Sequence, residues 1–248
     1  MMPITSNVAW DGRLEAFKGR DASHFVTTTA ATARTCASCG LPLQPGEALS
    51  LSVDVTEGTA PDGTEHVTFD PWICHRDCQE PGLTVRESAG PIEELTPLGA
   101  RLTLDHRDET GTRTVPALAF TLFPNMALRG FGGELISALV SVLLTHGFQL
   151  SLSADYGDIV EHTTGVKDSC SCTVTEQGFV SFDIDGESIF SRQLDLTDPG
   201  DACWMAAARE GTVLVISGDN LNFTEDGIDL DPAARLGTLV SGNVNVRT

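Results

Sequence analysis

Apolar and polar residues alternate with a period of two in several short stretches of the second half of the chain. Residues 101–106 and 112–123 show this alternation and are separated by the turn-forming sequence DETG, which predicts a β-hairpin. Two similar stretches flank Asp185-Gly186, a dipeptide typical of two-residue hairpin turns. We therefore expect strands joined by hairpins in a mostly antiparallel sheet.

One longer apolar stretch follows a different pattern. Residues 127–146 are apolar on nearly all sides of a helix and are followed by Gly147, which is typical of a buried helix with a glycine cap. A short helix is expected at 201–209 and a core strand at 212–217. Because strands outnumber helices and pair locally, the predicted class is α+β, with one long buried helix.

Proline and glycine mark a boundary between residues 80 and 97. The predicted organisation is an N-terminal arm at 1–33, a small cysteine-containing module at 34–90 and a larger acidic α+β domain at 96–248. Within the arm we expect a short helix near 12–18 and an extended segment at 25–35.

The charge of the chain narrows the classes of partner. The 248 residues carry 35 acidic and 15 basic side chains, a formal net charge of -20. The cysteine-containing module has three cations and nine anions, and the acidic excess continues through the larger domain. Phosphate and anionic-lipid surfaces are bound by clustered Lys and Arg, so this distribution argues against direct binding to nucleic acid or membranes. It favours a protein partner with a basic surface.

The N-terminus has neither a basic segment nor an apolar segment of the kind found in secretory signals. The longest apolar run, residues 135–144, is too short to span a bilayer. We therefore expect a cytoplasmic protein, in which cysteines serve as thiols or metal ligands and not as disulfides.

Two pairs of ligand-type residues form the strongest chemical signal. Cys36 and Cys39 are separated by two residues and are followed by Gly40, while His75 and Cys78 form a second pair with the same spacing. Four such groups make a closed tetrahedral Cys3His set, which predicts a structural zinc ion without an open position for catalysis. Cys74 is a rival to His75 as the third ligand. The residues between the pairs contain a Pro-Gly turn and two alternating runs, which predict a β-hairpin.

This order of knuckle, hairpin and His-x-x-Cys resembles treble-clef zinc fingers of the C-x2-C…H-x2-C type. Residues 36–78 look most like the poly(ADP-ribose) polymerase-type finger and the first half of a LIM domain, and Trp72 and Gly46-Glu47 are also similar to those families. The resemblance implies zinc and a helix that begins at the second pair. It does not extend to DNA recognition, because the basic face of polymerase-type fingers is absent here.

Two further groups are weaker candidates. Cys170 and Cys172 point to one face of an expected strand and, with Cys203, would form a second thiol site, although buried cysteines are common in hydrophobic cores. Asp155, Asp158 and His162 would supply general acid and base groups, although acidic clusters of this kind are usually solvated surface.

The sequence contains no complete catalytic constellation. We therefore expect a zinc-stabilised, non-enzymatic accessory protein, inhibitor- or immunity-like, that engages a basic protein. Two alternatives remain open: an enzyme with its active site in residues 96–248, and a nucleic-acid-associated regulator that acts through the finger.

Overall fold

The computed structural model describes residues 4–5, 7–60, 63–88, 95–108, 111–130, 135–219, 221–224 and 227–247. Strands make up 48% of the structure and helices 23%, and the first sheet is curled into a half-barrel. The predicted α+β class, with a small treble-clef module beside a sheet domain containing a long helix, is therefore wrong. The protein has a β-rich fold in which the cysteine pairs lie at one end of a large sheet.

The chain forms two compact units, each built from segments that are distant in sequence. Unit 1 consists of Met1–Thr96, Leu122–Ala138 and Asn222–Gly227, and unit 2 consists of Pro97–Thr121, Leu139–Leu221 and Ile228–Thr248. The division of the sequence into an arm at 1–33, a module at 34–90 and a domain at 96–248 remains a prediction. Among the described residues, no helix has the length and apolar character needed to cross a membrane.

Unit 1 contains a seven-stranded mixed sheet and short helices. The order of its strands is β1-β2-β3-β4-β8-β9. Strand β5 also pairs with β3, from Ser52 onward, after the two residues of β3 that pair with β2. Its elements are β1 (Ile4–Thr5), β2 (Val8–Ala9), a 3-10 helix (Gly12–Leu14), α1 (Glu15–Lys18), a second 3-10 helix (Gly19–Asp21), α2 (Ala22–Thr32), β3 (Leu49–Thr59), β4 (Glu65–His75), β5 (Gly82–Ser88), β8 (Asn125–Arg129), β9 (Leu135–Ser137) and β15 (Asn222–Thr224). The predicted hairpin between the cysteine pairs is confirmed, because β3 and β4 pair in antiparallel register from Leu49↔His75 to Thr59↔Glu65.

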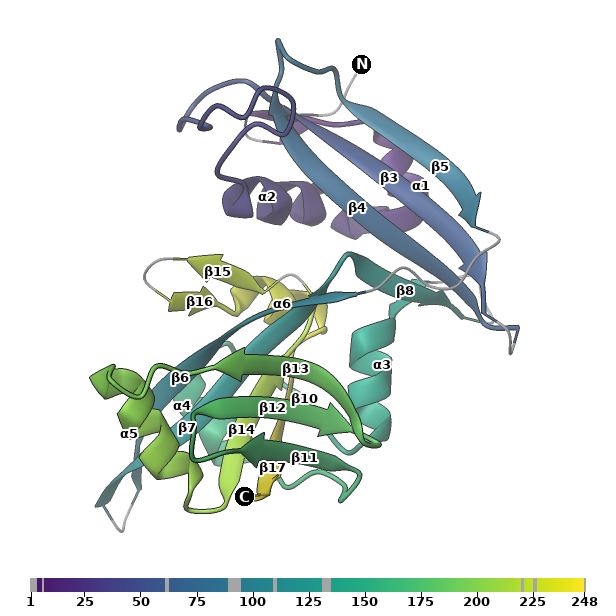
Figure 1. Ribbon diagram of the computed structural model, residues 1–248. Helices are drawn as coiled ribbons and strands as arrows, with labels where there is room; N and C mark the ends of the chain where they lie inside the picture. The colour runs from purple at the N-terminus through teal and green to yellow at the C-terminus, as the bar shows by residue number, and fades with distance from the viewer. Residues whose placement is uncertain are drawn as a thin grey trace. The chain divides into compact units, whose positions relative to one another are not determined.

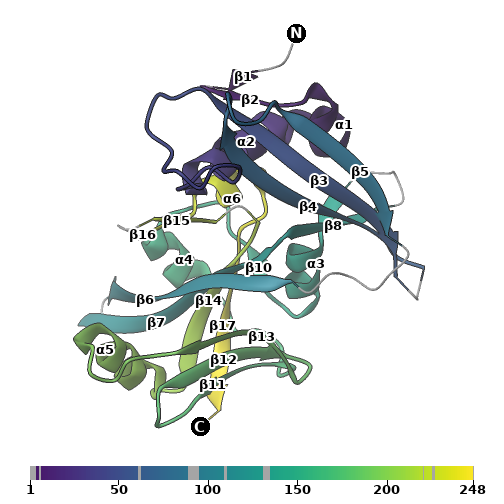
Figure 2. The ribbon, with the colours of Figure 1, turned by 45° about the horizontal axis from the view of Figure 1, so that its top comes forward.

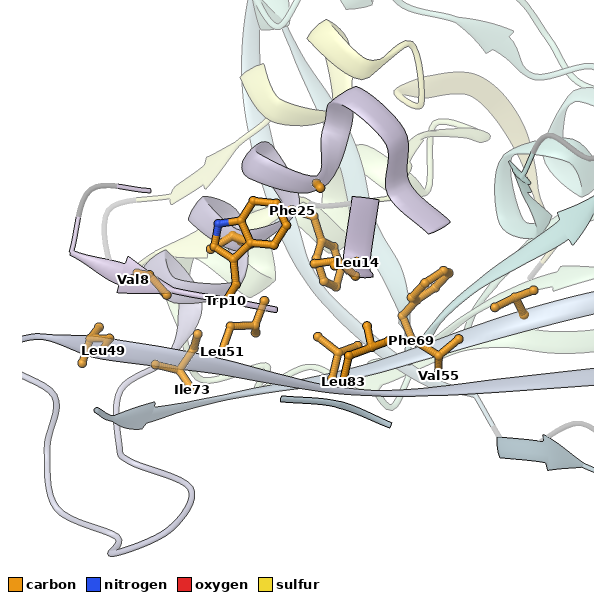
Figure 3. Packing of buried hydrophobic residues seen from close by; sticks show 14 of the residues in the cluster. Val8, Trp10, Leu14, Phe25, Leu49, Leu51, Val55, Phe69, Ile73 and Leu83 are labelled. Carbon is orange, nitrogen blue, oxygen red and sulfur yellow. The ribbon is translucent and has the colours of Figure 1, made fainter. Parts of the chain in front are cut away.

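One face of this sheet carries the core of unit 1. Apolar residues alternate along β3 and β4, so that Leu51, Val55 and Phe69 point to the same side. Figure 3 shows them packed against Trp10 and Leu14, which come from the segment before α2. In Figure 1, α1 and α2 lie along the same face of β3, β4 and β5. The first thirty residues therefore supply one side of the core that the long hairpin completes.

Residues 25–32 were predicted to be extended, but they form most of helix α2. Threonine has a weak helix propensity, so local preference alone does not predict this helix. Phe25 and Val26 are buried on its inner face, and this packing overrides the local preference. The hydroxyls of Thr27 and Thr29 donate to the carbonyl oxygens of Ser23 and Phe25, which keeps them satisfied within the helix.

Unit 2 contains an eight-stranded mixed sheet. Its order is β13-β12-β11-β17-β14-β7-β6, with β10 also paired to β17, and the β7–β14 and β11–β17 pairs are parallel. The elements are β6 (Thr96–Asp108), β7 (Gly111–Phe123), α3 (Ala138–Thr145), β10 (Gln149–Leu150), α4 (Tyr156–His162), β11 (Cys170–Val174), β12 (Phe179–Ile184), β13 (Glu187–Gln193), α5 (Pro199–Ala208), β14 (Thr212–Ser217), β16 (Gly227–Asp229), α6 (Asp231–Leu236) and β17 (Val240–Arg247). Figure 2 shows β11, β12 and β13 side by side.

Aromatic rings fill the core of unit 2. Phe120 of β7 lies 5.6 Å from Phe182 of β12 and 5.7 Å from Phe190 of β13, measured between ring centroids. Trp204 of α5 is fully buried, and its indole N–H donates to the carbonyl oxygen of Ala117 at 3.0 Å. Helix α5 is therefore attached to β7 by both packing and a satisfied polar contact.

The long buried helix predicted at 127–146 is wrong. Residues Asn125–Arg129 form β8, which pairs with β4 in the register His66↔Leu128, and of the described residues in this range only Ala138–Thr145 are helical. An apolar run of this kind fits a buried strand as well as a helix, and the partner strand β4 decides the outcome. Gly147 has φ +94°, the left-handed conformation expected of the residue after a helix.

The hairpin predicted at Asp185-Gly186 is confirmed. Asp185 and Gly186 have φ values of 52° and 86°, and the flanking residues pair as Ile184↔Glu187. Positive φ at both central positions gives the turn a twist that matches the flanking strands.

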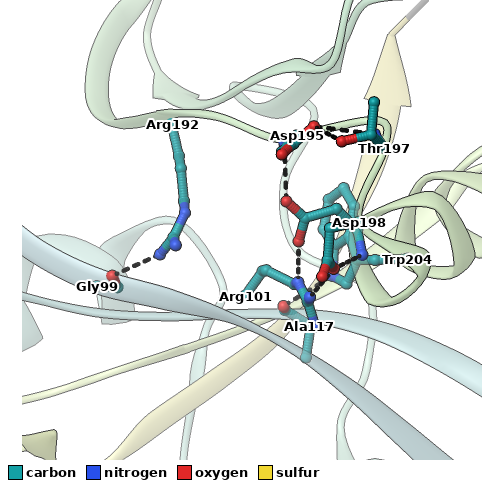
Figure 4. Close-up of polar contacts among 9 residues, drawn as sticks. Gly99, Arg101, Ala117, Arg192, Asp195, Thr197, Asp198 and Trp204 are labelled. Carbon is teal, nitrogen blue, oxygen red and sulfur yellow. Dashed lines mark hydrogen bonds and ion pairs between the residues drawn. The ribbon is translucent and has the colours of Figure 1, made fainter.

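A charged network ties α5 to β6 in unit 2. The Arg101 guanidinium donates to the carboxylates of Asp198 (3.1 Å) and Asp201, and Asp201 also accepts from the backbone N–H of Asp195 at 2.8 Å. Figure 4 shows Arg101 beside Asp198, the N-cap residue of α5, the helix that also carries Trp204. Burial raises the pKa of the Asp201 carboxyl, but the hydrogen bonds from Arg101 and Asp195 outweigh burial, so the pKa is lowered.

Replacing Asp201 by asparagine is expected to reduce the free energy of unfolding by about 1 kcal/mol at pH 7. Because the folded-state pKa is lowered, this contribution is present above the unfolded-state pKa and is lost as pH falls through the folded-state value. Urea unfolding of both proteins across pH 7 to 2.5 measures it. A difference in stability that stays constant or grows towards low pH contradicts the prediction.

Candidate metal centre

The first pair of ligands lies on a tight turn after α2, the knuckle Cys36–Gly40. The backbone N–H of Gly40 donates to the carbonyl oxygen of Cys36 at 2.8 Å, and the N–H of Cys36 donates to that of Leu41 at 2.8 Å. Gly40 has φ +73°, which a residue with a Cβ adopts only at a cost. The turn therefore brings the sulfurs of Cys36 and Cys39 to one side of the chain.

The second pair comes from the end of β4. His75 is the last residue of this strand, and the N–H of Cys78 donates to the carbonyl oxygen of His75 at 2.9 Å across a short turn. The knuckle is fixed to the same strand, because Ala37 N–H donates to the carbonyl oxygen of Ile73 at 3.0 Å. The helix implied by the treble-clef resemblance is not found after Cys78, since the turn leads into β5.

The four predicted ligands meet in space. The ligand atoms of Cys36, Cys39, His75 and Cys78 all lie within 4.8 Å of one another. His75 Nδ1 is 3.5 Å from the Cys39 sulfur and 3.8 Å from the Cys78 sulfur. Zinc bonds of about 2.3 Å to sulfur and about 2.0 Å to nitrogen place tetrahedral S and N ligands about 3.6 Å apart. The residues therefore fit a zinc ion without rearrangement of the backbone.

Glu47 holds the imidazole of His75 in place. Its carboxylate oxygen Oε2 lies 3.3 Å from His75 Nε2 and accepts a hydrogen bond from the backbone N–H of Gln44 at 2.8 Å. With the Nε2 proton directed to Glu47, Nδ1 presents its lone pair to the sulfurs, which is the usual carboxylate–histidine–metal arrangement. The resemblance to known fingers includes Glu47, but its role follows only from the pairing that places Leu49 opposite His75.

Backbone amides prepare Cys36 as a ligand. Burial raises the pKa of the Cys36 thiol, but the N–H groups of Cys39, His75 and Ser38 outweigh burial and lower the pKa to about 6. The His75 N–H lies 3.4 Å from the Cys36 sulfur. The thiolate, which is the form that binds metal, therefore prevails at neutral pH.

The neighbouring thiols oppose one another's ionisation. A hydrogen bond with Cys39, followed by desolvation and the negative charge of Cys39, raises the pKa of Cys78 to about 11. Without a cation, each thiolate opposes ionisation of the next. A divalent metal removes this repulsion and releases the proton, so the arrangement favours a bound cation.

Cys74, the rival ligand, lies outside the group. The Cys74 thiol is buried, donates to Gln79 Oε1 at 3.5 Å and also interacts with Cys36, but its sulfur does not belong to the group of four converging ligand atoms. Burial raises the pKa of this thiol. The structure thus brings His75, and not Cys74, to the other three sulfurs.

The second thiol site is not assembled. Among the described ranges, no other group of three or more His, Cys, Asp or Glu side chains has its ligand atoms this close. Cys170 and Cys172 are buried in β11, where burial raises the pKa of Cys172 to about 12, whereas Cys203 is exposed on α5. Cys172 therefore has the character of a core residue.

The acid–base candidates are engaged in local contacts around α4. Asp155 is the N-cap and accepts from Asp158 N–H at 3.1 Å, while Ser153 donates to the Asp158 carboxylate at 2.7 Å. His162 Nδ1 donates to the backbone oxygen of Asp158 at 2.8 Å. Asp158 and His162 do line a cavity of about 290 Å³, but the contacts found between them run through the backbone.

Replacing Glu47 by glutamine is expected to weaken zinc binding about tenfold, because the loss of a second-layer carboxylate lowers the basicity of the ligating imidazole. Competition with a chromophoric chelator measures the zinc affinity. Glu80→Gln is the matched control, since Glu80 is exposed and makes the same change in charge outside the ligand group. Equal affinities for the two variants would contradict the positioning role of Glu47.

Comparisons of the chain with protein-family models, with curated proteins and with solved structures return no match.

Proposed function

We propose that this protein is a zinc-stabilised binding protein that engages the basic surface of another protein, as an inhibitor-like or immunity-like accessory factor does. The zinc is structural in this proposal. The observation that supports a structural role is the composition of the ligand group. Three sulfurs and one imidazole nitrogen lie within 4.8 Å of one another and would fill all four positions of a tetrahedral zinc ion.

The position of the metal ligands indicates what the zinc would stabilise. Cys36 and Cys39 follow α2, whereas His75 ends β4 and Cys78 lies in the turn after it. A metal that binds all four residues would attach the segment after α2 to the end of β4, the strand against which α2 packs. Thiol ligands require reducing conditions, which agrees with a cytoplasmic location.

The proposed partner follows from charge. The chain has a net charge of -20, and unit 1 exposes carboxylates around its sheet. These include Glu65, Asp70, Asp77, Glu80 and Glu87. Such a surface accelerates association with a basic protein and repels nucleic acid.

Affinity capture from the native host at 50 mM and 500 mM salt tests the partner class. We expect a captured protein of high isoelectric point whose recovery falls at least tenfold at the higher salt, because exposed charges are screened. Capture of a neutral or acidic protein, or of nucleic acid, would contradict the proposal.

A further inference from the structure

A polar cavity lies at the end of the β3–β4 pair that is distant from the zinc ligands. Its volume is about 430 Å³, and its lining includes Glu57, Gly58, Glu65, His66, Glu87 and Arg129. The register Thr59↔Glu65 places it at the opposite end of the hairpin from Leu49↔His75. We call it the glutamate cavity.

Carboxylates outnumber cations in the glutamate cavity. Arg129 of β8 donates to Glu57 at 2.7 Å, and its Nε lies 3.3 Å from a carboxylate oxygen of Glu65. Glu87 of β5 lies directly opposite Glu57 in the parallel register. Within the described part of the chain, no cation pairs with Glu87. Two like charges opposite each other are unfavourable, so the pair favours an additional cation from outside.

A second and independent feature is the unpartnered Nδ1 atom of His66. Its residue is 4% exposed, it lines the cavity, and its Nδ1 is buried without a hydrogen-bond partner among the described residues. The ring lies against Gly58, since a Cβ built on Gly58 would stand 2.6 Å from His66 Nε2. Buried polar atoms are normally satisfied, and one that is not calls for a missing partner.

The distribution of these groups distinguishes between possible ligands. Among the described residues, Cys36, Cys39, His75 and Cys78 form the only group of metal-binding side chains with converging ligand atoms, so the glutamate cavity does not match a divalent cation. Carboxylates spread around an open volume fit a planar cation with several donors, and guanidinium offers five N–H groups.

We propose that the glutamate cavity binds the guanidinium group of an arginine side chain presented by the basic partner. This inference rests on the proposed function and deepens it, because it assigns one anchoring site on the acidic surface. The Glu57–Arg129–Glu65 network holds the walls in place, and Glu87 supplies the uncompensated charge. Gly58 leaves room for the imidazole.

Titration of the full-length zinc-loaded protein with N-acetyl-arginine amide tests the site directly, with binding followed by the ring signals of His66. The neutral isostere N-acetyl-citrulline amide is the control ligand. We expect the arginine probe to bind at least tenfold more tightly than the citrulline probe. Equal binding, no binding, or displacement of the probe by calcium or manganese at equimolar concentration would overturn the proposal.

Variants locate the site. Glu87→Gln is expected to weaken the arginine probe about tenfold, whereas Glu176→Gln, which removes one exposed carboxylate of unit 2, leaves it unchanged. Gly58→Ala is expected to abolish the effect on His66, because the new methyl group displaces the ring. Glu87 is exposed on β5, so its variant remains a test even where Gly58→Ala fails to fold. Unchanged affinity in Glu87→Gln would overturn the assignment.

A peptide with one central arginine, acetylated and amidated at its ends, is compared with agmatine. The comparison distinguishes an arginine side chain of a protein from a free guanidinium compound as the ligand of the cavity. We expect the peptide to bind at least as tightly as agmatine. Tenfold tighter binding of agmatine would overturn the protein-side-chain assignment. If the wild-type protein does not bind the arginine probe, while both it and Glu87→Gln capture a basic protein in a salt-sensitive manner, the cavity assignment is refuted and the proposed function stands. If the arginine probe binds but no basic protein is captured, the cavity binds guanidinium and the proposed function is refuted.

Discussion

Replacing Cys39 by serine is expected to abolish zinc binding and to destabilise unit 1 by about 3–5 kcal/mol. A neutral hydroxyl replaces one of three sulfur ligands, and the binding free energy of a structural zinc contributes directly to folding. Unit 1 retains its hydrophobic core, so we expect destabilisation and not complete loss of structure. Hydrogen exchange should accelerate most in the knuckle and at the end of β4. Zinc content and urea unfolding measure the two effects.

The control for Cys39→Ser is Cys203→Ser. Cys203 is also an exposed cysteine, but it lies on α5 outside the ligand group. We expect this variant to keep its zinc and its stability within about 0.5 kcal/mol. Retention of zinc by Cys39→Ser, or loss of zinc without a change in stability, would contradict a structural role.

Replacing Phe69 by alanine is expected to cost about 3–5 kcal/mol, the typical loss for removal of a large buried aromatic side chain. Phe69 is fully buried in β4, and its ring centroid lies 6.2 Å from those of Phe17 and Phe25. Lys18 Nζ lies 3.6 Å from the same ring centroid and adds a cation–π contact. The substitution therefore removes the contact point between the hairpin and the first helices.

Phe179→Ala serves as the comparison for Phe69→Ala, because Phe179 is 41% exposed on β12. Urea unfolding should place its loss below about 1 kcal/mol, since a partly exposed ring buries less apolar area. Similar losses in the two variants would indicate that the described core of unit 1 is not the source of its stability.

The strongest local signals in the sequence predicted real features. Cys36 and Cys39 are separated by two residues, and a short turn alone brings their sulfurs together. Asp185-Gly186 likewise encodes its turn through the conformations of two residues. In both cases the structure depends on neighbours in sequence, so no distant contact had to be known.

Features that depend on distant pairing could not be predicted. Residues 125–129 form a strand because β4 offers an edge, and the threonine-rich α2 is helical because the sheet buries Phe25. The choice between Cys74 and His75 depends on which side chain converges with the sulfurs of Cys36, Cys39 and Cys78. Glu47 reaches His75 only through the β3–β4 register. Each requires knowledge of which strands are neighbours.

X-ray absorption at the zinc edge, on protein purified without added metal, tests the central claim most directly. It reports both the presence of zinc and the identity of its ligands. We predict one zinc per chain with three sulfur ligands at about 2.3 Å and one nitrogen ligand at about 2.0 Å. A folded protein without zinc, or a zinc ion bound only by oxygen and nitrogen, would contradict the account.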